Sequence, residues 1–214
     1  MIREMRAAIF DLDGVIVDTA KYHYLAWKRL ANEHGFDFTE VDNERLKGVS
    51  RTRSLEILLE IGELTVDEDA KIQMAAQKNT WYVDYIRQMD ASEILPGVMD
   101  YLLGIRAKGI KTALGSASKN APLILERLNI SALFDAVIDG NTVTKAKPDP
   151  EVFLCAAREL GISPASCVVF EDAEAGIEAA RSAGMGVVGI GNPLILKEAD
   201  VVLPGLFELS VISV

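Results

Sequence analysis

Two aspartates one residue apart, Asp11 and Asp13, are the residues of this chain best suited to chemistry. They follow the apolar run Ala7–Phe10 and precede Gly14, a pattern typical of a buried parallel strand that opens into a loop at its carboxyl end. Open α/β sheets bind their ligands at that end of the strands. We therefore expect one carboxylate to attack a phosphorus atom while the other transfers a proton.

A second acidic pair, Glu171 and Asp172, follows another apolar run, Val168–Phe170. If the two strands are neighbours, Asp11, Asp13 and the second pair face each other across one crevice, where like charges raise one another's pKa values. A hard divalent cation relieves this repulsion, and an all-oxygen ligand set with room for water and phosphate suits Mg²⁺. A lone Asp-x-Asp is more simply an acidic turn, so the second pair is what favours a metal site formed by these four acids.

Two further strand ends carry residues suited to an anion. The segment Gly115–Asn120 is small and polar and leads into a helix, so its hydroxyls and backbone N–H groups can hold a phosphate. The segment Lys145–Pro150 contains prolines that fix a turn and place Lys147 near the edge of the sheet. Each signal is weak by itself, because many turns look alike and a lysine is often only a solvated charge.

Composition excludes several classes of function. The chain has 214 residues, half of them apolar, and a net charge of −10, which argues against nucleic acid or an anionic membrane as the main partner. Its apolar runs fall short of the roughly 20 residues of a membrane helix, and we expect a soluble, cytoplasmic monomer. The two cysteines, Cys155 and Cys167, are expected to be core thiols.

The elements that position these residues alternate between strand and helix from about residue 95 onward. This alternation predicts an α/β fold, a doubly wound parallel sheet in a Rossmann-like core formed by residues 1–15 and 91–214. Residues 16–90 are helical in pattern and predict an inserted helical cap domain, and such modules usually act as lids. The predicted strands are Ala7–Phe10, Ile110–Leu114, Ala136–Ile138, Cys167–Phe170, Gly186–Ile190 and Val201–Leu203.

The order of the four motifs, each at the carboxyl end of a predicted strand, resembles the haloacid dehalogenase superfamily of phosphoryl-transfer enzymes over the whole chain. The resemblance implies that Asp11 is the nucleophile that becomes an aspartyl phosphate and that Asp13 is the general acid and base. It also implies that Ser116 and Lys147 hold the phosphoryl group. The acids that bind Mg²⁺ in this resemblance are Asp11, Asp13, Glu171 and Asp172.

Within the superfamily, four segments resemble the mutases that interconvert β-glucose 1-phosphate and glucose 6-phosphate through a bisphosphate: Asp18–His23, Leu46–Arg51, Lys78-Asn79 and Ser116–Asn120. This resemblance adds Thr19 and His23 to the catalytic residues and implies that His23 and Lys78 link cap closure to catalysis. Residues that it assigns to the sugar phosphate are Trp27, Lys47, Gly48, Val49, Ser50, Arg51, Ser54, Lys78, Ser116, Ala117, Ser118, Lys119, Asn120 and Lys147.

Simpler interpretations stay open for three of these residues. Trp27 is more often core than a platform for a sugar, His23 can be an ordinary surface histidine, and Arg51 can belong to a solvated face. Three functions also compete: a sugar-phosphate mutase, a phosphatase of the same superfamily, and a non-enzymatic binding protein on the same fold. The last is disfavoured because every acid that the chemistry needs is present. The mutase is favoured by Gly48–Arg51 and Ser118–Asn120.

Overall fold

The chain folds into two compact units in its computed structural model, which describes residues 5–46 and 50–210. One unit comprises Met1–Asp18 and Met89–Val214, and the other comprises Thr19–Gln88. The segment that links the two halves of the first unit is therefore the second unit itself. Each unit has its own buried residues, and each is described separately below.

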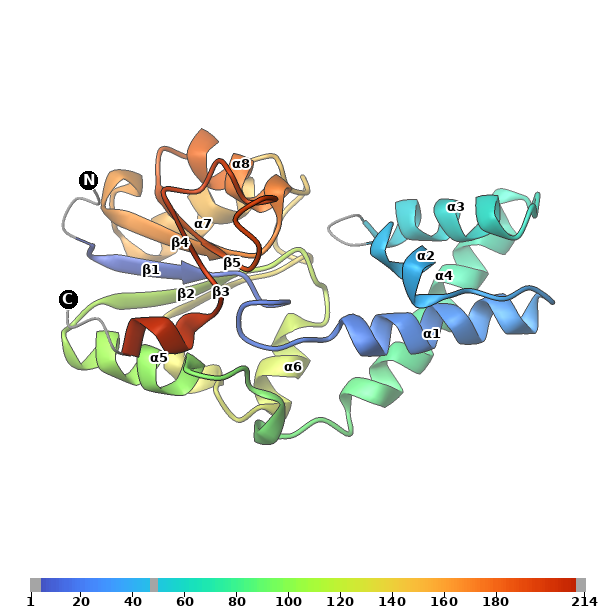
Figure 1. Ribbon diagram of the computed structural model, residues 1–214, viewed down its shortest axis with the longest axis horizontal. Coiled ribbons are helices and arrows are strands. Elements are labelled where there is room, and N and C mark those ends of the chain that lie inside the picture. Colours follow the sequence, from blue (N-terminus) through green and yellow to red (C-terminus); the bar gives the residue numbers. More distant parts are fainter. Residues whose placement is uncertain (1–4, 47–49, 211–214) are drawn as a thin grey trace. The chain divides into compact units, whose positions relative to one another are not determined.

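The first unit is built on a six-stranded sheet in the order β3-β2-β1-β4-β5-β6, with every neighbouring pair parallel (Figure 1). The predicted doubly wound parallel sheet is confirmed. All four residues of the central strand β1 are buried, as expected for a strand covered on both faces. The strands are β1 (Ala7–Phe10), β2 (Lys111–Gly115), β3 (Ala136–Ile138), β4 (Cys167–Glu171), β5 (Gly186–Ile190) and β6 (Val201–Leu203).

Helices cover both faces of this sheet: α7 and α8 lie on one face and α5 on the other (Figure 1). Ile9 of β1 belongs to the apolar cluster that contains Phe153 of α7, whereas Phe10 stacks on Phe170 and meets Tyr101 of α5 edge to face. The unit also contains α5 (Val98–Ala107), α6 (Ala121–Arg127), α7 (Glu151–Leu160), α8 (Glu174–Ser182), and the 3-10 turns η1 (Ala91–Glu93), η2 (Ser131–Leu133), η3 (Pro164–Ser166) and η4 (Leu206–Ser210).

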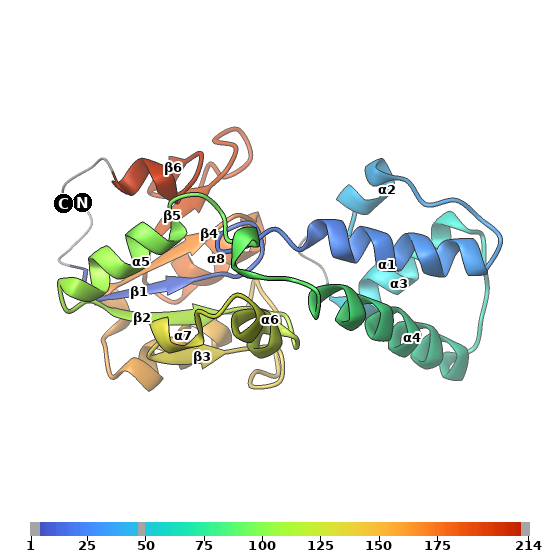
Figure 2. The ribbon, with the colours of Figure 1, turned by 90° about the horizontal axis from the view of Figure 1, so that it is seen from below.

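The second unit is helical throughout its described residues, with α1 (Ala20–Glu33), α2 (Glu40–Glu44), α3 (Arg51–Ile61) and α4 (Glu68–Ile86). The long helices α1 and α4 pack against each other (Figure 2). Helix α3 begins at Arg51, where the Ser50 side chain caps it by accepting a hydrogen bond from Arg53 N. Asp67 caps α4 in the same way.

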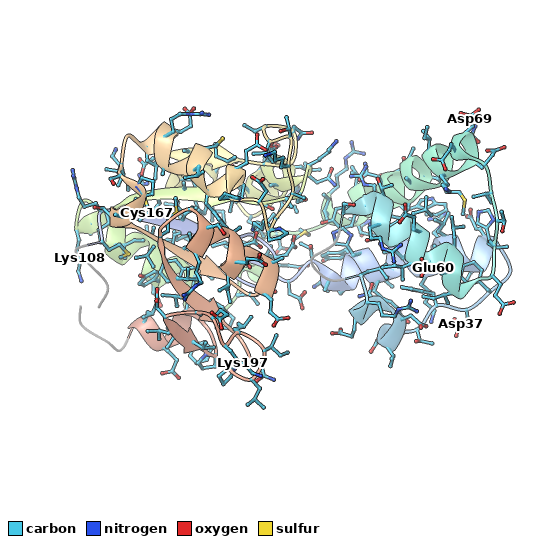
Figure 3. All side chains as sticks on the ribbon, turned by 90° about the horizontal axis from the view of Figure 1, so that it is seen from above. Asp37, Glu60, Asp69, Lys108, Cys167 and Lys197 are labelled. Carbon is cyan, nitrogen blue, oxygen red and sulfur yellow. The ribbon has the colours of Figure 1, made fainter. Side chains whose placement is uncertain are left out.

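Both cysteines are free thiols in the first unit, as predicted. Cys167 is buried at the start of β4 (Figure 3), and Cys155 is half-buried in α7. Burial raises the pKa of the Cys167 thiol to about 11, so this residue is a core side chain rather than a reactive one. None of the helices in residues 5–46 and 50–210 is both long and apolar enough to cross a lipid bilayer.

Candidate active site

Asp11 stands directly after β1, at the carboxyl end of the sheet. Its backbone N–H donates to the carbonyl of Phe170 on β4 at 2.9 Å, so the first residue of the loop is held against the neighbouring strand. Gly14 then turns the chain with φ 75°, and its N–H donates to Val17 O at 2.8 Å. A side chain at this glycine would collide with the carboxylate of Asp172. Gly14 therefore lets Asp172, which follows β4, come close to the loop after β1.

Lys147 joins two of these acids. Its Nζ lies 2.5 Å from Asp11 Oδ1 and 2.5 Å from Glu171 Oε1, and the lysine side chain is only 10% exposed. Glu171 Oε2 accepts a hydrogen bond from Ala173 N at 2.9 Å. Burial alone would lower the pKa of Lys147, but the negative charges of Asp11 and Glu171 outweigh burial and raise it above its ordinary value. The lysine therefore stays charged beside the predicted nucleophile.

The loop that carries Lys147 is held by Glu151, a residue that the sequence analysis did not single out. Glu151 Oε2 accepts hydrogen bonds from Lys145 N at 2.7 Å and Thr144 N at 3.1 Å. Asp149 Oδ1 accepts from Glu151 N in turn. An acid at the first position of α7 is itself a helix-start signal. Its second role, holding the preceding loop through hydrogen bonds, cannot be predicted from the sequence pattern.

Asp172 lies among three other acids. Desolvation by the surrounding protein, together with the negative charges of Asp11, Glu171 and Asp13, raises the pKa of Asp172 to about 8, although part of its side chain is exposed. For Asp172, the repulsion among acids that the sequence analysis predicted thus adds to desolvation, and a bound cation would reduce it. Within the described residues, no three acidic, histidine or cysteine side chains converge into a preassembled metal site. The oxygen atoms of these acids are of the kind that Mg²⁺ prefers in sites where water and phosphate complete its coordination.

Gly176 in α8 explains how Glu171 fits beneath this helix. A side chain at position 176 would collide with the Glu171 carboxylate. The glycine is buried within the helix, where it costs about 1 kcal/mol relative to alanine. A glycine at this position is therefore explained by the close approach of Glu171 to the helix and not by helix propensity.

The loop after β2 provides the predicted phosphate-binding residues. Ser116 is 2% exposed, and its N–H donates to Ile138 O of β3 at 3.0 Å. Its Oγ accepts from Ser118 N at 3.1 Å, and Ser118 Oγ accepts from Asn120 N at 3.3 Å. Ala117 and Lys119 are exposed, and Asn120 begins α6. Ser116 follows β2 by one residue as Asp11 follows β1, and β1 and β2 are adjacent.

In the helical unit, His23 of α1 meets Lys78 of α4. Lys78 Nζ donates to His23 Nδ1 at 2.7 Å, which places the histidine proton on Nε2. The His23 ring stacks on Tyr82, whose hydroxyl donates to Thr19 Oγ1 at 3.3 Å. Desolvation, followed by the positive charges of Lys78 and Arg51, lowers the pKa of His23 well below its ordinary value. The histidine is therefore a neutral, hydrogen-bonded residue rather than an ordinary surface one.

Trp27 is 2% exposed, and the ammonium group of Lys78 lies 4.5 Å from the centre of its ring. Lys78 is itself 2% exposed, with the Tyr82 ring 4.8 Å from its ammonium. A buried lysine between two aromatic faces is stabilised by cation–π attraction. Trp27 is thus core of the helical unit, and its predicted contact with a sugar ring stays a prediction.

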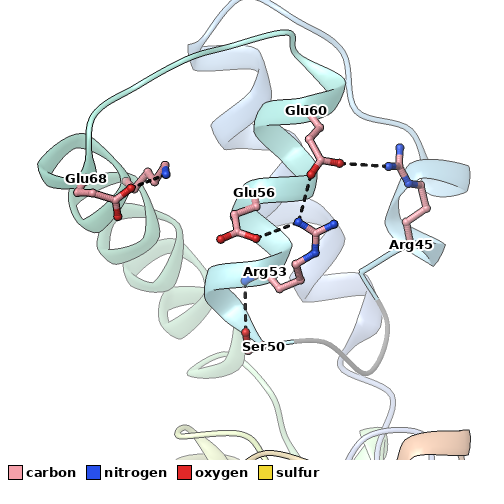
Figure 4. Close-up of polar contacts among 7 residues, drawn as sticks. Arg45, Ser50, Arg53, Glu56, Glu60 and Glu68 are labelled. Atoms are coloured by element: carbon pink, nitrogen blue, oxygen red, sulfur yellow. Dashed lines mark hydrogen bonds and ion pairs between the residues drawn. The ribbon is translucent and has the colours of Figure 1, made fainter.

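The remaining predicted residues of this unit lie at the start of α3. Arg51 is half-buried, whereas Ser50 is exposed and Ser54 is buried. Arg53 is occupied elsewhere: it pairs with Glu56 at 2.9 Å and with Glu60 at 3.1 Å (Figure 4). The predicted residues Lys47, Gly48 and Val49 lie outside the described part of the chain.

Comparisons with known proteins show which family this chain belongs to. The chain matches the model of the haloacid dehalogenase-like hydrolases over residues 5–184. It is 45% identical to the β-phosphoglucomutase of Bacillus subtilis (strain 168) over 208 residues, which are 96% of this chain and 92% of the relative. The solved β-phosphoglucomutase of Clostridium difficile is 44% identical, with a TM-score of 0.89 over 96% of this chain and 93% of its own. The phosphorylated carbohydrates phosphatase of Thermotoga maritima is 34% identical over 85% of this chain and 82% of the relative.

Proposed function

The chain belongs to the haloacid dehalogenase-like hydrolase family, and on that basis we propose that it is a β-phosphoglucomutase, which interconverts β-D-glucose 1-phosphate and glucose 6-phosphate. The observation that carries the phosphoryl-transfer chemistry is the charged Lys147 between Asp11 and Glu171 at the carboxyl end of the sheet. The 45% identity to the Bacillus subtilis enzyme supports the mutase as the form of that chemistry.

In the proposed reaction, a carboxylate oxygen of Asp11 attacks the phosphorus of a sugar phosphate. The bond from phosphorus to the sugar oxygen breaks, and Asp13 gives its proton to that oxygen. The resulting aspartyl phosphate then passes its phosphoryl group to another hydroxyl, from which Asp13 takes the proton. The intermediate, glucose 1,6-bisphosphate, can bind in either of two orientations. When it binds in the reverse orientation, these two steps leave the phosphate on the other position of the sugar. Lys147 and Ser116 hold the phosphoryl oxygens throughout.

Relatives in this family are generally Mg²⁺-dependent. For this chain, we assign the Mg²⁺ ligands to the carboxylates of Asp11 and Asp172 and the backbone carbonyl of Asp13, with Glu171 beside them. When bound, the ion offsets the charge repulsion between Asp11 and the incoming phosphate. The raised pKa of Asp172 supports this assignment, because desolvation and, after it, the charges of the neighbouring acids disfavour its carboxylate, and a cation would offset both.

We assign the first unit to catalysis and the helical unit Thr19–Gln88 to the role of a cap. The cap would contribute Arg51 to the second phosphate of the bisphosphate, with Ser50 and Ser54 near it. Lys78 and His23 would make the activity of Asp13 depend on a bound sugar, and Thr19, at the start of α1, would take part in that dependence. We further propose that the enzyme acts in the cytoplasm as a monomer on small sugar phosphates.

A sugar-phosphate phosphatase is the alternative, favoured by the 34% identity to the Thermotoga maritima phosphatase. The two activities share the aspartyl phosphate and differ in whether a sugar hydroxyl or water accepts the phosphoryl group.

The experiment that separates them follows β-glucose 1-phosphate with Mg²⁺, scoring glucose 6-phosphate and free phosphate in the same samples. We expect isomerisation to exceed phosphate release, and a catalytic amount of glucose 1,6-bisphosphate to remove an initial lag. Faster release of phosphate than isomerisation, across a panel of hexose phosphates, would establish the phosphatase instead.

A further inference from the structure

Asp139 is a buried carboxylate that the proposed mechanism does not use. It follows β3 at the carboxyl end of the sheet and is only 5% exposed. Its Oδ1 accepts hydrogen bonds from Asn141 N at 2.9 Å, Thr142 N at 3.1 Å and Thr142 Oγ1 at 2.8 Å. Burial alone would raise the pKa of Asp139, but hydrogen bonds from the Asn141 and Thr142 side chains and backbone outweigh it and lower the pKa. The residue is therefore a charged acceptor at the centre of a tight loop.

Asn141 connects the loop after β3 to the loop after β2. Its side-chain Nδ2 donates to Asp139 Oδ2 at 2.9 Å and to the carbonyl of Lys119 at 2.9 Å. Both partners are acceptors only, so they fix which end of the Asn141 amide faces them. The two loops also meet through Gly140, whose N–H donates to Ser118 O at 3.3 Å. A side chain on Gly140 would collide with Ala117 O, so glycine permits this contact.

These contacts hold two successive carbonyls, those of Ser118 and Lys119, towards the loop that follows β3. In a trans peptide the C=O and the next N–H point in opposite directions. The N–H group of Lys119 is thereby aimed away from the β3 loop, and the N–H group of Asn120 donates to Ser118 Oγ within its own loop. The sheet places β3 and β1 on opposite sides of β2. The geometry of both peptides in the predicted phosphate-binding loop thus depends on the loop that follows β3.

We propose that Asp139 and Asn141 are positioning residues for phosphate binding, acting through the Ser116–Asn120 loop without touching the substrate. The inference rests on the proposed function in one respect: it takes the Ser116–Asn120 loop to be the part of the site that holds the phosphoryl group. The inference also explains what shapes that loop: the hydrogen bonds come from Gly140 and Asn141, which follow the neighbouring strand β3, and not from residues of the loop itself.

Two exposed neighbours give a matched comparison. Asn141→Ala removes one side-chain hydrogen bond to Asp139 and also the bond to Lys119 O, whereas Thr142→Ala removes one bond to Asp139 and leaves the Lys119 contact in place. Asn141→Leu keeps about the volume of the side chain, adds no charge beside Asp139 and removes the donor. A role in filling space would survive Asn141→Leu, and a role in holding the carbonyl would not.

The measurement is the dissociation constant of inorganic phosphate in the presence of Mg²⁺, by titration calorimetry on the full chain. We expect Asn141→Ala and Asn141→Leu to raise this constant about 3- to 10-fold, the effect of losing the hydrogen bond to the Lys119 carbonyl, and Thr142→Ala to change it less than about twofold. In the isomerase assay, the same two Asn141 variants should raise KM more than they lower kcat.

Equal loss in Asn141→Ala and Thr142→Ala, or unchanged phosphate binding in both Asn141 variants, overturns the inference. Absence of phosphate binding in the wild-type protein overturns it as well. A wild-type protein that binds phosphate but does not isomerise β-glucose 1-phosphate contradicts the proposed mutase only. In that case the calorimetry of the variants still decides whether Asn141 positions the Ser116–Asn120 loop.

Discussion

Lys147 Nζ lies 2.5 Å from Asp11 Oδ1, although 136 residues of chain separate the two. The same ammonium group is 2.5 Å from Glu171 Oε1 and 4.8 Å from the centre of the Phe153 ring. One buried cation thus joins the loop after β1 to the last residue of β4. Because Lys147 sits on a loop that Glu151 fastens to α7, the position of its charge is set by the fold before any substrate binds.

We expect Lys147→Met to destabilise the protein as well as inactivate it. Removing the cation leaves Asp11 and Glu171 as uncompensated buried charges, which typically costs about 3–5 kcal/mol of unfolding free energy. Urea unfolding at about pH 7.5 measures this. The control is Lys145→Met, since Lys145 is exposed and pairs with Asp149 at the surface; it should unfold like the wild type. Equal stability of the two variants would contradict a structural role for the buried pair.

Substitutions of the two aspartates after β1, Asp11 and Asp13, should affect different steps of the reaction. Asp11→Asn is expected to abolish the covalent phosphoenzyme, because an amide oxygen is a poor nucleophile. Asp13→Asn should slow transfer about 10²–10⁴-fold, the usual contribution of a positioned acid and base, while phosphate and Mg²⁺ still bind. Acid quenching with labelled substrate detects the phosphoenzyme, and calorimetry follows Mg²⁺. Loss of all Mg²⁺ binding in Asp13→Asn would assign the side chain to the metal instead.

Gly176→Ala and Gly104→Ala compare two helical glycines. A methyl group at position 176 meets the Glu171 carboxylate, whereas position 104 in α5 has open space around it. We expect Gly176→Ala to destabilise the protein by about 1–3 kcal/mol, as overpacking does. Gly104→Ala should stabilise it by about 0.5–1 kcal/mol through helix propensity. Thermal unfolding of both variants is the measurement, and a stabilising Gly176→Ala would show that Glu171 moves aside freely.

The strand ends of this site could be predicted from sequence because each one is marked twice, by an apolar run and by the polar residues that follow it. Asp11, Ser116 and Glu171 are all found this way. The observed boundaries of the strands differ from the predicted ones by a residue or two because of local contacts. Thus β4 continues through Glu171, one residue past the prediction, because Glu171 pairs with Gly189 of β5.

The supporting contacts could not be predicted in this way. Asn141 to Lys119 and Glu151 to Lys145 are side-chain bonds to backbone atoms in irregular loops, where neither the 3.6-residue nor the 2-residue period operates. The burial of Lys78 was equally hidden, since a lysine in a helix is normally expected on the surface. Its burial depends on Trp27 and Tyr82 from two different helices, a pairing that only the tertiary structure provides.

His23 should make the helical unit less stable in mild acid. Its pKa is lowered in the folded protein, so the unfolded chain binds the proton more readily. Its stabilising contribution is therefore complete above about pH 6.5 and is lost as pH falls from there towards the folded pKa. Relative to His23→Gln, the wild type should lose about 1.4 kcal/mol of unfolding free energy between about pH 7.5 and 5.5. Both tryptophans, Trp27 and Trp81, lie in this unit, so their fluorescence reports its unfolding. A constant difference between the two proteins over this range would show that His23 is not held neutral in the folded protein.

Arg51 and Arg53, two residues apart at the start of α3, should differ sharply in function. Arg51 is half-buried, and burial lowers its pKa, whereas Arg53 is bound to Glu56 and Glu60 on the surface of the helix. If Arg51 grips the second phosphate of the bisphosphate with a charged, bidentate contact, Arg51→Ala should lower kcat/KM for isomerisation about 10- to 100-fold.

Hydrolysis of p-nitrophenyl phosphate, a small ester with only one phosphate, should change less than about twofold in the same variant. Arg53→Ala should leave both activities near the wild type, because its ion pairs lie on an exposed surface and contribute little. Measuring the two reactions side by side for the two variants separates a grip on the distal phosphate from a general loss of folding. Equal losses of isomerisation and ester hydrolysis in Arg51→Ala would assign Arg51 to the stability of α3 and remove it from substrate binding.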